Sequence, residues 1–322
     1  MIALAAFIHY ITIGLTTAAS SIGVSLGQAA ATRAGLEAID RQPAARTDIA
    51  RTLIIALALI ETGAMLGLLV PLILFFRPPL TFNGALAEIG VGIAISLPAL
   101  FTGYASSMPA SEAFNAMSRQ PFLAKKIRNI LILSQSLIQT PLIFGFCIAL
   151  LIASLIPSLT NSSQAMALIA SGLSIGLGCV GPAVGSGYFT AHACKSTGFN
   201  KTVFQKIFTF TLISQAIIET PVIFASIISL LLLSIAPTVP DYPVIGLAYL
   251  VFAFTMGIGT LGAGISSGRV AASAALQIGY NPSLYTFISR SSMLAQGLID
   301  TIPIYAFIIA LWLLFTPLIK VL

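Results

Sequence analysis

Three acidic residues lie in the middle of apolar stretches of the sequence, and a fourth stretch has an amide at the matching place. The acids are Glu61, Glu219 and Asp300, and the amide is Gln139. A charged carboxylate inside a membrane is costly, so acids at such positions usually mark a path for ions. Burial favours the neutral form of a carboxyl group, and a nearby cation favours the charged form. Each acid could therefore take up a proton in one environment and release it in another.

Further oxygen atoms lie close to these positions. A threonine follows each of them, as Thr62, Thr140, Thr220 and Thr301, and its hydroxyl could bond the carboxyl or bond back to the helix. Prolines follow in three stretches, as Pro141, Pro221 and Pro303. Because proline has no N–H, the carbonyls of Leu137, Ile217 and Ile299 are freed. They are candidate ligands for a hydronium, a water or a sodium ion, or they mark a kink relieved by threonine or water.

The apolar stretches are long enough to cross a bilayer. Of the 322 residues, 57% are hydrophobic and 7% are charged, whereas a soluble domain has about 25% charged residues. Runs of about 20 apolar residues recur along the chain. We therefore predict an all-α transmembrane protein that spans the membrane several times.

The net charge of +6 comes from loops and does not indicate nucleic-acid binding. Thirteen of the fifteen basic residues gather around four alternate connections between apolar stretches. They are Arg33, Arg41, Arg46, Arg51, Arg119, Lys125, Lys126, Arg128, Lys195, Lys201, Lys206, Arg269 and Arg290. By the positive-inside rule these connections face the cytoplasm, and both termini lie on the opposite side.

The four positions are 78, 80 and 81 residues apart, which indicates an internal repeat. We predict eight transmembrane helices as four tandem helical hairpins, over residues 1–78, 79–158, 159–238 and 239–322. The first helix of most hairpins is rich in glycine, so we expect these helices to pack closely around a tight ring. The bulkier second helix suits an outer, lipid-facing position. In hairpin two, Pro98 and Pro109 predict a first helix that is kinked or less tightly packed.

Two further spacings repeat with the hairpins. Twenty residues before Glu61 and Gln139 lie the loop sequences Arg41-Gln42-Pro43 and Arg119-Gln120-Pro121. In hairpins three and four this place falls on Phe199 and Tyr280. Thirteen residues before each loop position, the first helix carries one polar residue: Gln28, Ser106, Ser186 or Ser267.

This layout resembles the c-subunits of F-type ATP synthases, the proteolipids that form the membrane rotor ring. Members of that family normally have one hairpin, with a glycine-rich inner helix, an Arg-Gln-Pro loop and one carboxylate on the outer helix. Here the resemblance covers essentially the full length, four times over. V-type rotor proteolipids, which commonly fuse hairpins and often lose a carboxylate, are the near alternative, and the Arg-Gln-Pro loops favour the F-type.

The resemblance implies a c-ring protein that carries H⁺, or less readily Na⁺, on Glu61, Glu219 and Asp300. The implied partners are copies of the chain in a ring, an a-subunit stator with a membrane arginine, central-stalk subunits and membrane lipid. The stalk would dock on Arg41, Gln42, Pro43, Arg119, Gln120 and Pro121, although these could equally be ordinary solvated loop residues. A bacterial inner membrane is the implied location. No cofactor is expected, and ATP chemistry would belong to partner subunits.

The identity of the ion depends on the neighbours of each acid. In the family, sodium sites combine an inner-helix glutamine with a glutamate followed by serine or threonine, and Gln28, Glu61 and Thr62 match this pattern. Serine replaces the glutamine in the other hairpins, so we favour protons. The expected ion-site neighbours are Gln28, Thr62, Ser186, Thr220, Ser267, Thr301 and Tyr305. Gln139, Ser106 and Thr140 would form a degenerate site, either as tolerated drift or as a means to lower the number of ions per turn.

Other readings are less consistent with the sequence. A secondary transporter built from repeats usually has inverted repeats, whereas every basic loop here lies on the same side. A purely structural ring would leave three buried acids unexplained. His9 and His192 are far apart in sequence, so we expect no metal site. Cys147, Cys179 and Cys194 are expected to be buried and outside any disulfide framework.

Overall fold

The computed structural model describes residues 2–76 and 81–321, and the regular structure in this part of the chain is helical. Hairpin one is formed by α1 (Ile2–Arg41) and α2 (Arg46–Phe75). Hairpin two has α3 (Phe82–Ala105), α4 (Ser107–Arg119), α5 (Ala124–Ile138) and α6 (Thr140–Leu155). Hairpin three has α7 (Ser162–Gly178), α8 (Val180–Thr197) and α9 (Phe204–Ile235). Hairpin four has α10 (Pro243–Tyr280), α11 (Tyr285–Ile299) and α12 (Thr301–Val321).

These helices form eight rods within the described residues, each long and apolar enough to cross a membrane. Some rods consist of two helices end to end, such as α3 with α4. The predicted hairpin boundaries at 158/159 and 238/239 fall directly after the short 3₁₀ turns Ile156–Ser158 and Ala236–Thr238. The boundary at 78/79 lies outside the described residues. The chain is thus an integral, multi-pass membrane protein, as its composition predicts.

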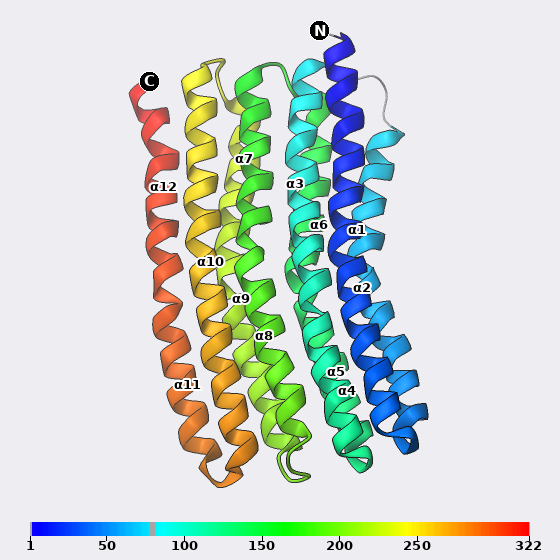
Figure 1. Ribbon diagram of the computed structural model, residues 1–322. Coiled ribbons are helices and arrows are strands. Elements are labelled where there is room, and N and C mark those ends of the chain that lie inside the picture. Colours follow the sequence, from blue (N-terminus) through cyan, green and yellow to red (C-terminus); the bar gives the residue numbers. More distant parts are fainter. Residues whose placement is uncertain (1, 77–80, 322) are drawn as a thin grey trace.

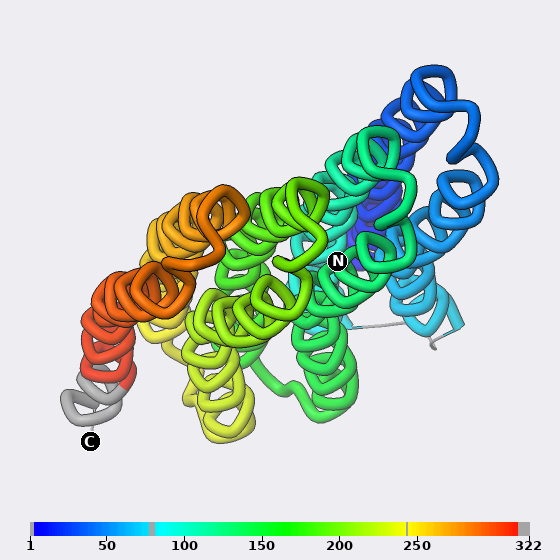
Figure 2. Tube along the Cα trace, turned by 90° about the horizontal axis from the view of Figure 1, so that it is seen from below, coloured from blue at the N-terminus to red at the C-terminus, as the bar shows by residue number. Residues whose placement is uncertain are grey.

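The rods stand side by side in two curved rows (Figure 2). One row contains the first rod of every hairpin, namely α1, α3–α4, α7–α8 and α10, and its members contact one another along the row. The other row contains α2, α5–α6, α9 and α11–α12. The first row lies on the concave side of the curve, which agrees with the predicted inner position of the glycine-rich helices.

Glycine makes the close approach within the inner row possible. A Cβ atom on Gly185 would overlap the backbone of Gly264, and one on Gly172 would overlap the backbone of Gly90. Any side chain at these places would therefore push two helices apart. The prediction of close packing between first helices is confirmed.

The inner rod of hairpin two is interrupted at Ser106, between α3 and α4. Pro109 cannot donate to the carbonyl of Ala105, which explains a break at this point. The predicted kink is therefore correct, but the alternative of loose packing is wrong, since Gly90 and Gly92 of this rod are in close contact with hairpins three and one. A second break, at Cys179 between α7 and α8, was not predicted; Pro182 removes the donor for the Gly178 carbonyl there.

The basic loops lie at one end of the bundle, and both marked chain ends lie at the other (Figure 1). Three of the loops contain the same 3₁₀ turn with proline in its first position: Pro43–Ala45, Pro121–Leu123 and Pro282–Leu284. Proline suits that place because its fixed φ matches the turn and its missing N–H would be unpaired there anyway. In hairpin three Lys201 stands in place of the proline, and the helices are joined by simple turns instead.

The cysteines only partly follow expectation. Cys179 and Cys194 are buried, as predicted, but Cys147 is exposed on α6. The error arose because an apolar sequence does not distinguish a side chain that faces protein from one that faces lipid.

Candidate functional site

The four repeated positions lie close to the middle of the outer rods. Glu61 is in α2 and Glu219 is in α9, while Gln139 and Asp300 stand at breaks between two helices. Pro141 follows the first break and Pro303 follows the second, whereas α9 continues through Pro221. The helix is therefore interrupted next to the proline in hairpins two and four, whereas hairpin three accommodates its proline without a break.

Glu219 is half-buried and has two polar neighbours from different hairpins. Gln215, one turn earlier in α9, donates from Nε2 to Glu219 Oε1 at 3.0 Å. Thr140, from hairpin two, also lies close to this carboxyl. Ser186 is fully buried on the facing inner rod, and its hydroxyl has no hydrogen-bond partner in the described part of the chain. The site thus lies at the junction of hairpins two and three.

Asp300 is half-buried as well. Its Oδ1 atom is enclosed and has no hydrogen-bond partner among the residues described, and the same holds for the hydroxyl of Ser267 on the inner rod. Gln296, one turn before Asp300, is fully buried, and its Nε2 donates to Ser292 Oγ at 3.0 Å and to Ser214 Oγ at 3.3 Å. Ser214 belongs to hairpin three, so this site also lies next to a hairpin junction.

Gln139 replaces the carboxylate in hairpin two and acts as a bridge. It is 5% exposed, and its Nε2 donates to Leu59 O of hairpin one at 3.2 Å and to Ser106 Oγ at 3.1 Å. Gln135, one turn earlier, donates to Ala56 O at 3.3 Å and to Ser106 O at 3.0 Å. Both amides therefore connect the outer rods of hairpins one and two. The structure brings Gln139 and Ser106 together, whereas Thr140 lies close to Glu219 of hairpin three.

Glu61 differs from the other acids because it is exposed. Hairpin one is at the end of both rows, so within one chain no earlier hairpin covers this side chain (Figure 2). Gln28 Nε2 lies 3.5 Å from Leu57 O, one helical turn before Glu61, and Thr62 is half-buried.

Two of the other expected neighbours, Thr220 and Thr301, do not donate to a carboxyl group. Thr220 donates to Ala216 O at 3.2 Å, and Thr301 donates to Leu298 O at 2.7 Å, so both hydroxyls bond back to their own helix. Tyr305 is 62% exposed on α12.

Three glutamines, Gln135, Gln215 and Gln296, lie at the sites although they were not predicted from the sequence. Each stands four residues before a repeated position, which is about one helical turn and the same face of the helix. That spacing, found in three of the four hairpins, was the signal that could have revealed them.

Glu88, a fully buried acid near the start of α3, was not predicted either. His9 Nδ1 of α1 lies 2.7 Å from Glu88 Oε2, so the pair joins the inner rods of hairpins one and two. The two residues are 79 positions apart, which explains why the sequence did not connect them. No group of three or more metal-ligating side chains occurs in the described residues.

The residues at the loop end are positioned by contacts along the row. Arg41 donates to Asn115 Oδ1 of hairpin two at 2.9 Å, and the Arg119 guanidinium is 6.0 Å from the centre of the Phe199 ring. Phe199 stacks on Tyr280 with ring centres 4.9 Å apart. Arg41, Pro43, Arg119 and Gln120 are exposed, and Gln42 and Pro121 are half-buried.

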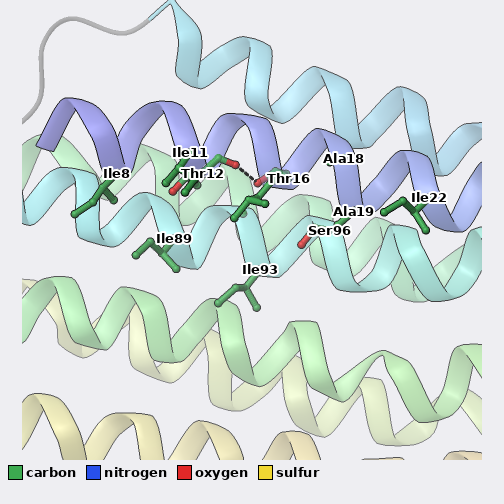
Figure 3. Close-up of a pocket in the computed structure, with 12 residues that line it drawn as sticks. Ile8, Ile11, Thr12, Thr16, Ala18, Ala19, Ile22, Ile89, Ile93 and Ser96 are labelled. Atoms are coloured by element: carbon green, nitrogen blue, oxygen red, sulfur yellow. Dashed lines mark hydrogen bonds between the residues drawn. The ribbon is translucent and has the colours of Figure 1, made fainter. Parts of the chain in front are cut away.

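A groove of about 420 Å³ lies between α1 and α3, away from the acids. Figure 3 shows its lining, which is mainly isoleucine and alanine with the hydroxyls of Thr12, Thr16 and Ser96. Thr16 donates to Thr12 O at 2.7 Å, so one of these hydroxyls is already satisfied. With no titratable side chain in its wall, the groove is suited to apolar contacts and not to ion transport.

Comparison with known proteins decides the family. The model of the ATP synthase c-subunit family matches residues 11–74, 89–152, 169–232 and 250–313, one segment in each hairpin. The chain belongs to this family. Each match includes one of the four repeated positions, Glu61, Gln139, Glu219 or Asp300.

Individual c-subunits resemble single hairpins of this chain. The ATP synthase c-subunit 2 of Cereibacter sphaeroides is 46% identical over 61 residues, which are 19% of this chain and 74% of the relative. The ATP synthase c-subunit of Alkaliphilus oremlandii is 41% identical over 61 residues, 19% of this chain and 69% of the relative. The chloroplastic c-subunit of Diacronema lutheri is 41% identical over 71 residues, 22% of this chain and 86% of the relative.

These matches confirm the resemblance noted from the sequence. The chain is a fused, four-hairpin c-subunit, a rotor proteolipid of a rotary ATP synthase.

Proposed function

We propose that Glu61, Glu219 and Asp300 each carry one proton through the membrane and so couple proton flow to rotation of the ring. The observation that carries the proposal is the environment of Glu219, a carboxyl group at mid-membrane that accepts from one amide and lies close to Thr140 of the preceding hairpin. Such a carboxyl can stay neutral while it faces lipid, because burial disfavours its charge. Beside a cation in a watery channel the charged form is favoured, and the proton leaves.

The partners follow from the same cycle. A stator a-subunit would supply the membrane arginine that draws the proton from each acid, and membrane lipid would cover the remaining acids. The loop residues Arg41, Gln42, Pro43, Arg119, Gln120 and Pro121 would dock on the central stalk. The clustering of basic residues at this end supports a cytoplasmic location for the loops. The membrane would be a bacterial inner membrane.

Copies of the chain would close the ring by joining hairpin four to hairpin one. Within the chain, Gly23 and Gly181 face Leu100 and Leu261 of the following hairpin. Gly262 occupies the equivalent place in hairpin four, yet nothing lies within 4 Å of it. Gly14 in hairpin one is likewise open, although its counterparts Gly92 and Gly172 face the preceding hairpin. These two open glycines support a ring in which a second copy covers both edges.

Gln139 would leave one hairpin in four without an ion, because an amide does not titrate. A ring made only of this chain would then carry three protons for every four hairpins. Fewer ions per turn allow a larger ion gradient to be built per ATP, so this composition favours ATP-driven pumping, or synthesis only under a large driving force. The measured ion-to-ATP ratio, set against the hairpin count of an imaged ring, tests this step. A ratio that matches every hairpin would contradict it.

Carbodiimide labelling tests the proton sites themselves. The reagent attacks protonated carboxyl groups in apolar surroundings, and peptide mass spectrometry identifies which residues are modified. We expect modification of Glu61, Glu219 and Asp300, and no protection by sodium chloride relative to choline chloride. Protection by sodium would show that the ion is Na⁺, and absence of modification at all three acids would refute the proposal.

A further inference from the structure

We propose that Gln215 and Gln296 are positioning residues that supply the side-chain amide of their ion sites from the outer helix, in place of the inner-helix amide that Gln28 supplies in hairpin one. The inference rests on the proposed function of the three acids and extends it. It assigns a role to two buried side chains outside the expected set of site neighbours, and it makes the three acidic sites alike in composition.

The side-chain amide lies on the inner helix in hairpin one and on the outer helix in the other three hairpins, at two positions that are in register. In every hairpin the inner polar position, the outer position 29 residues later and the ion position 33 residues later are in register. Hairpin one has glutamine in the inner position and Leu57 in the outer one. The other three hairpins have serine in the inner position and glutamine in the outer one. Each hairpin therefore contains one amide at this pair of positions.

The contacts show that the two positions face each other. Gln28 Nε2 of the inner helix lies 3.5 Å from Leu57 O of the outer helix. Gln135 Nε2 of the outer helix lies 3.0 Å from Ser106 O of the inner helix, across the same pair of positions. An amide from either helix thus enters the same space, one turn from the ion position.

The outer amide reaches the carboxyl directly in hairpin three, where Gln215 donates to Glu219 at 3.0 Å. Gln215 and Gln296 are both fully buried. Their Oε1 atoms have no hydrogen-bond partner among the described residues, and the same is true of the buried hydroxyls of Ser186 and Ser267. Buried polar oxygens without a partner are costly, so they indicate a place where a water or a cation binds.

An amide is suited to this task because it has both kinds of group. Its N–H₂ can donate to the carboxyl, which fixes the orientation of the side chain, and its oxygen can accept from a hydronium or coordinate a sodium ion. The serine residues on the inner helices therefore do not make hairpins three and four poorer in ligands than hairpin one. All three acids would take the same monovalent cation.

The test compares labelling rates at individual acids in the assembled complex. Gln215→Leu removes the donor to Glu219 and frees its side chain, so we expect carbodiimide to modify Glu219 about fivefold faster, the factor that one neutral hydrogen bond typically represents. Glu61 and Asp300 in the same chain should keep their rates. Gln296 donates to Ser292 and Ser214 and not to Asp300. Gln296→Leu therefore removes an acceptor, Oε1, which has no partner among the described residues, and we expect it to change the labelling rate of Asp300 alone.

Gln135→Leu is the matched control, since Gln135 has the same position and burial in a hairpin without an acid. It should leave the labelling of Glu219 and Asp300 unchanged. If Gln135→Leu and Gln215→Leu alter Glu219 equally, the effect is one of packing and the proposal is wrong.

A further test moves the side-chain amide of hairpin one from the inner helix, at residue 28, to the outer helix, at residue 57. Gln28→Ser should change the labelling rate of Glu61, and the double variant Gln28→Ser with Leu57→Gln, which copies the arrangement of hairpin three, should restore it. A sodium chloride arm distinguishes the cation: protection that disappears in Gln215→Leu assigns Na⁺, and absence of protection assigns a proton.

Failure of the proposed role of the amides can be told apart from failure of the proposed function of the acids. Unchanged rates in the Gln215→Leu and Gln296→Leu variants, or no restoration by Leu57→Gln, would overturn the role of the amides while the acids remain ion carriers. Absence of labelling in the unchanged chain would overturn the proposed function and this inference with it.

Discussion

At the scale of single residues, the amide at position 139 does structural work that a carboxylate could not do. Gln139 donates to the carbonyl oxygen of Leu59 and to the hydroxyl of Ser106, and it is almost fully buried. A carboxylate has no hydrogen to donate to the carbonyl. Loss of the acid in hairpin two is therefore tied to a bridge between the outer rods of hairpins one and two.

Gln139→Glu should create a fourth carboxyl group that carbodiimide modifies, in addition to Glu61, Glu219 and Asp300. The protonated carboxyl has one O–H where the amide has two N–H donors, so it can donate to only one of Leu59 O and Ser106 Oγ. We therefore expect the protein to be less stable by about 1–3 kcal/mol, the range for a buried acceptor left without its donor. Peptide mass spectrometry and thermal unfolding in detergent measure the two effects. Gln139→Leu is the control, which should lose stability without a new label. Failure of residue 139 to react would show that this hairpin cannot bind an ion even with an acid.

His9 is also predicted to matter for stability and not for ion transport. His9→Leu removes the group at 2.7 Å from the buried Glu88 carboxylate, so the free energy of unfolding should fall by about 1–3 kcal/mol. His192→Leu is the matched control, because His192 is only half-buried and its ring bonds Tyr188 O of its own helix. Equal unfolding temperatures for the two variants would contradict a structural role of the His9–Glu88 pair.

At the scale of helices, the inner row depends on glycines whose absence of a side chain lets backbones touch. Gly185→Ala places a Cβ atom against the backbone of Gly264, and backbone cannot move aside as a flexible side chain can. We expect a loss of about 1–3 kcal/mol, as for other overpacked positions. Gly14→Ala, with open space around it, should be neutral or slightly stabilising because alanine favours the helix. Thermal unfolding of the detergent-solubilised single chain compares them, and equal losses would contradict close packing as the cause.

The sequence was sufficient to predict the hairpins, the inner and outer rows and the loops, because charge within an apolar run and repetition at about 80 residues are strong signals. It was not sufficient for contacts that depend on how hairpins pack. The approach of His9 to Glu88 joins residues 79 positions apart. The return of the Thr220 hydroxyl to Ala216 is a choice of rotamer. The exposure of Glu61 depends on its hairpin being at the edge of the rows, which composition does not reveal.

At the scale of the whole molecule, equivalent loop residues of neighbouring hairpins contact one another along the row, from hairpin two to hairpin four. Arg119 lies over Phe199, and Phe199 stacks on Tyr280, each at the same place in its hairpin. Tyr280 is 60% exposed. In a closed ring the next member of the series would be Arg41 of a second copy, as a guanidinium over an aromatic ring.

Tyr280→Cys combined with Arg41→Cys should therefore form disulfides between chains under oxidation, in a background without the three native cysteines. Gel electrophoresis should show a ladder of covalent oligomers that collapses on reduction. Tyr280→Cys with Phe7→Cys is the control, because Phe7 is 34 residues from Arg41 in the same helix, about 50 Å away. Cross-linking only within single chains, or equal ladders in both pairs, would contradict the proposed joint.

The most direct measurement of the central claim is ion-driven ATP synthesis by the complete enzyme in liposomes when Glu61→Gln, Glu219→Gln and Asp300→Asn are combined. The control carries three equivalent changes away from the sites, Asp48→Asn, Glu112→Gln and Asp241→Asn. We predict that the first enzyme makes no ATP in response to an imposed ion gradient, while the control does so at a rate close to that of the unchanged enzyme. Ion-driven synthesis that survives the loss of all three carboxylates would contradict the account.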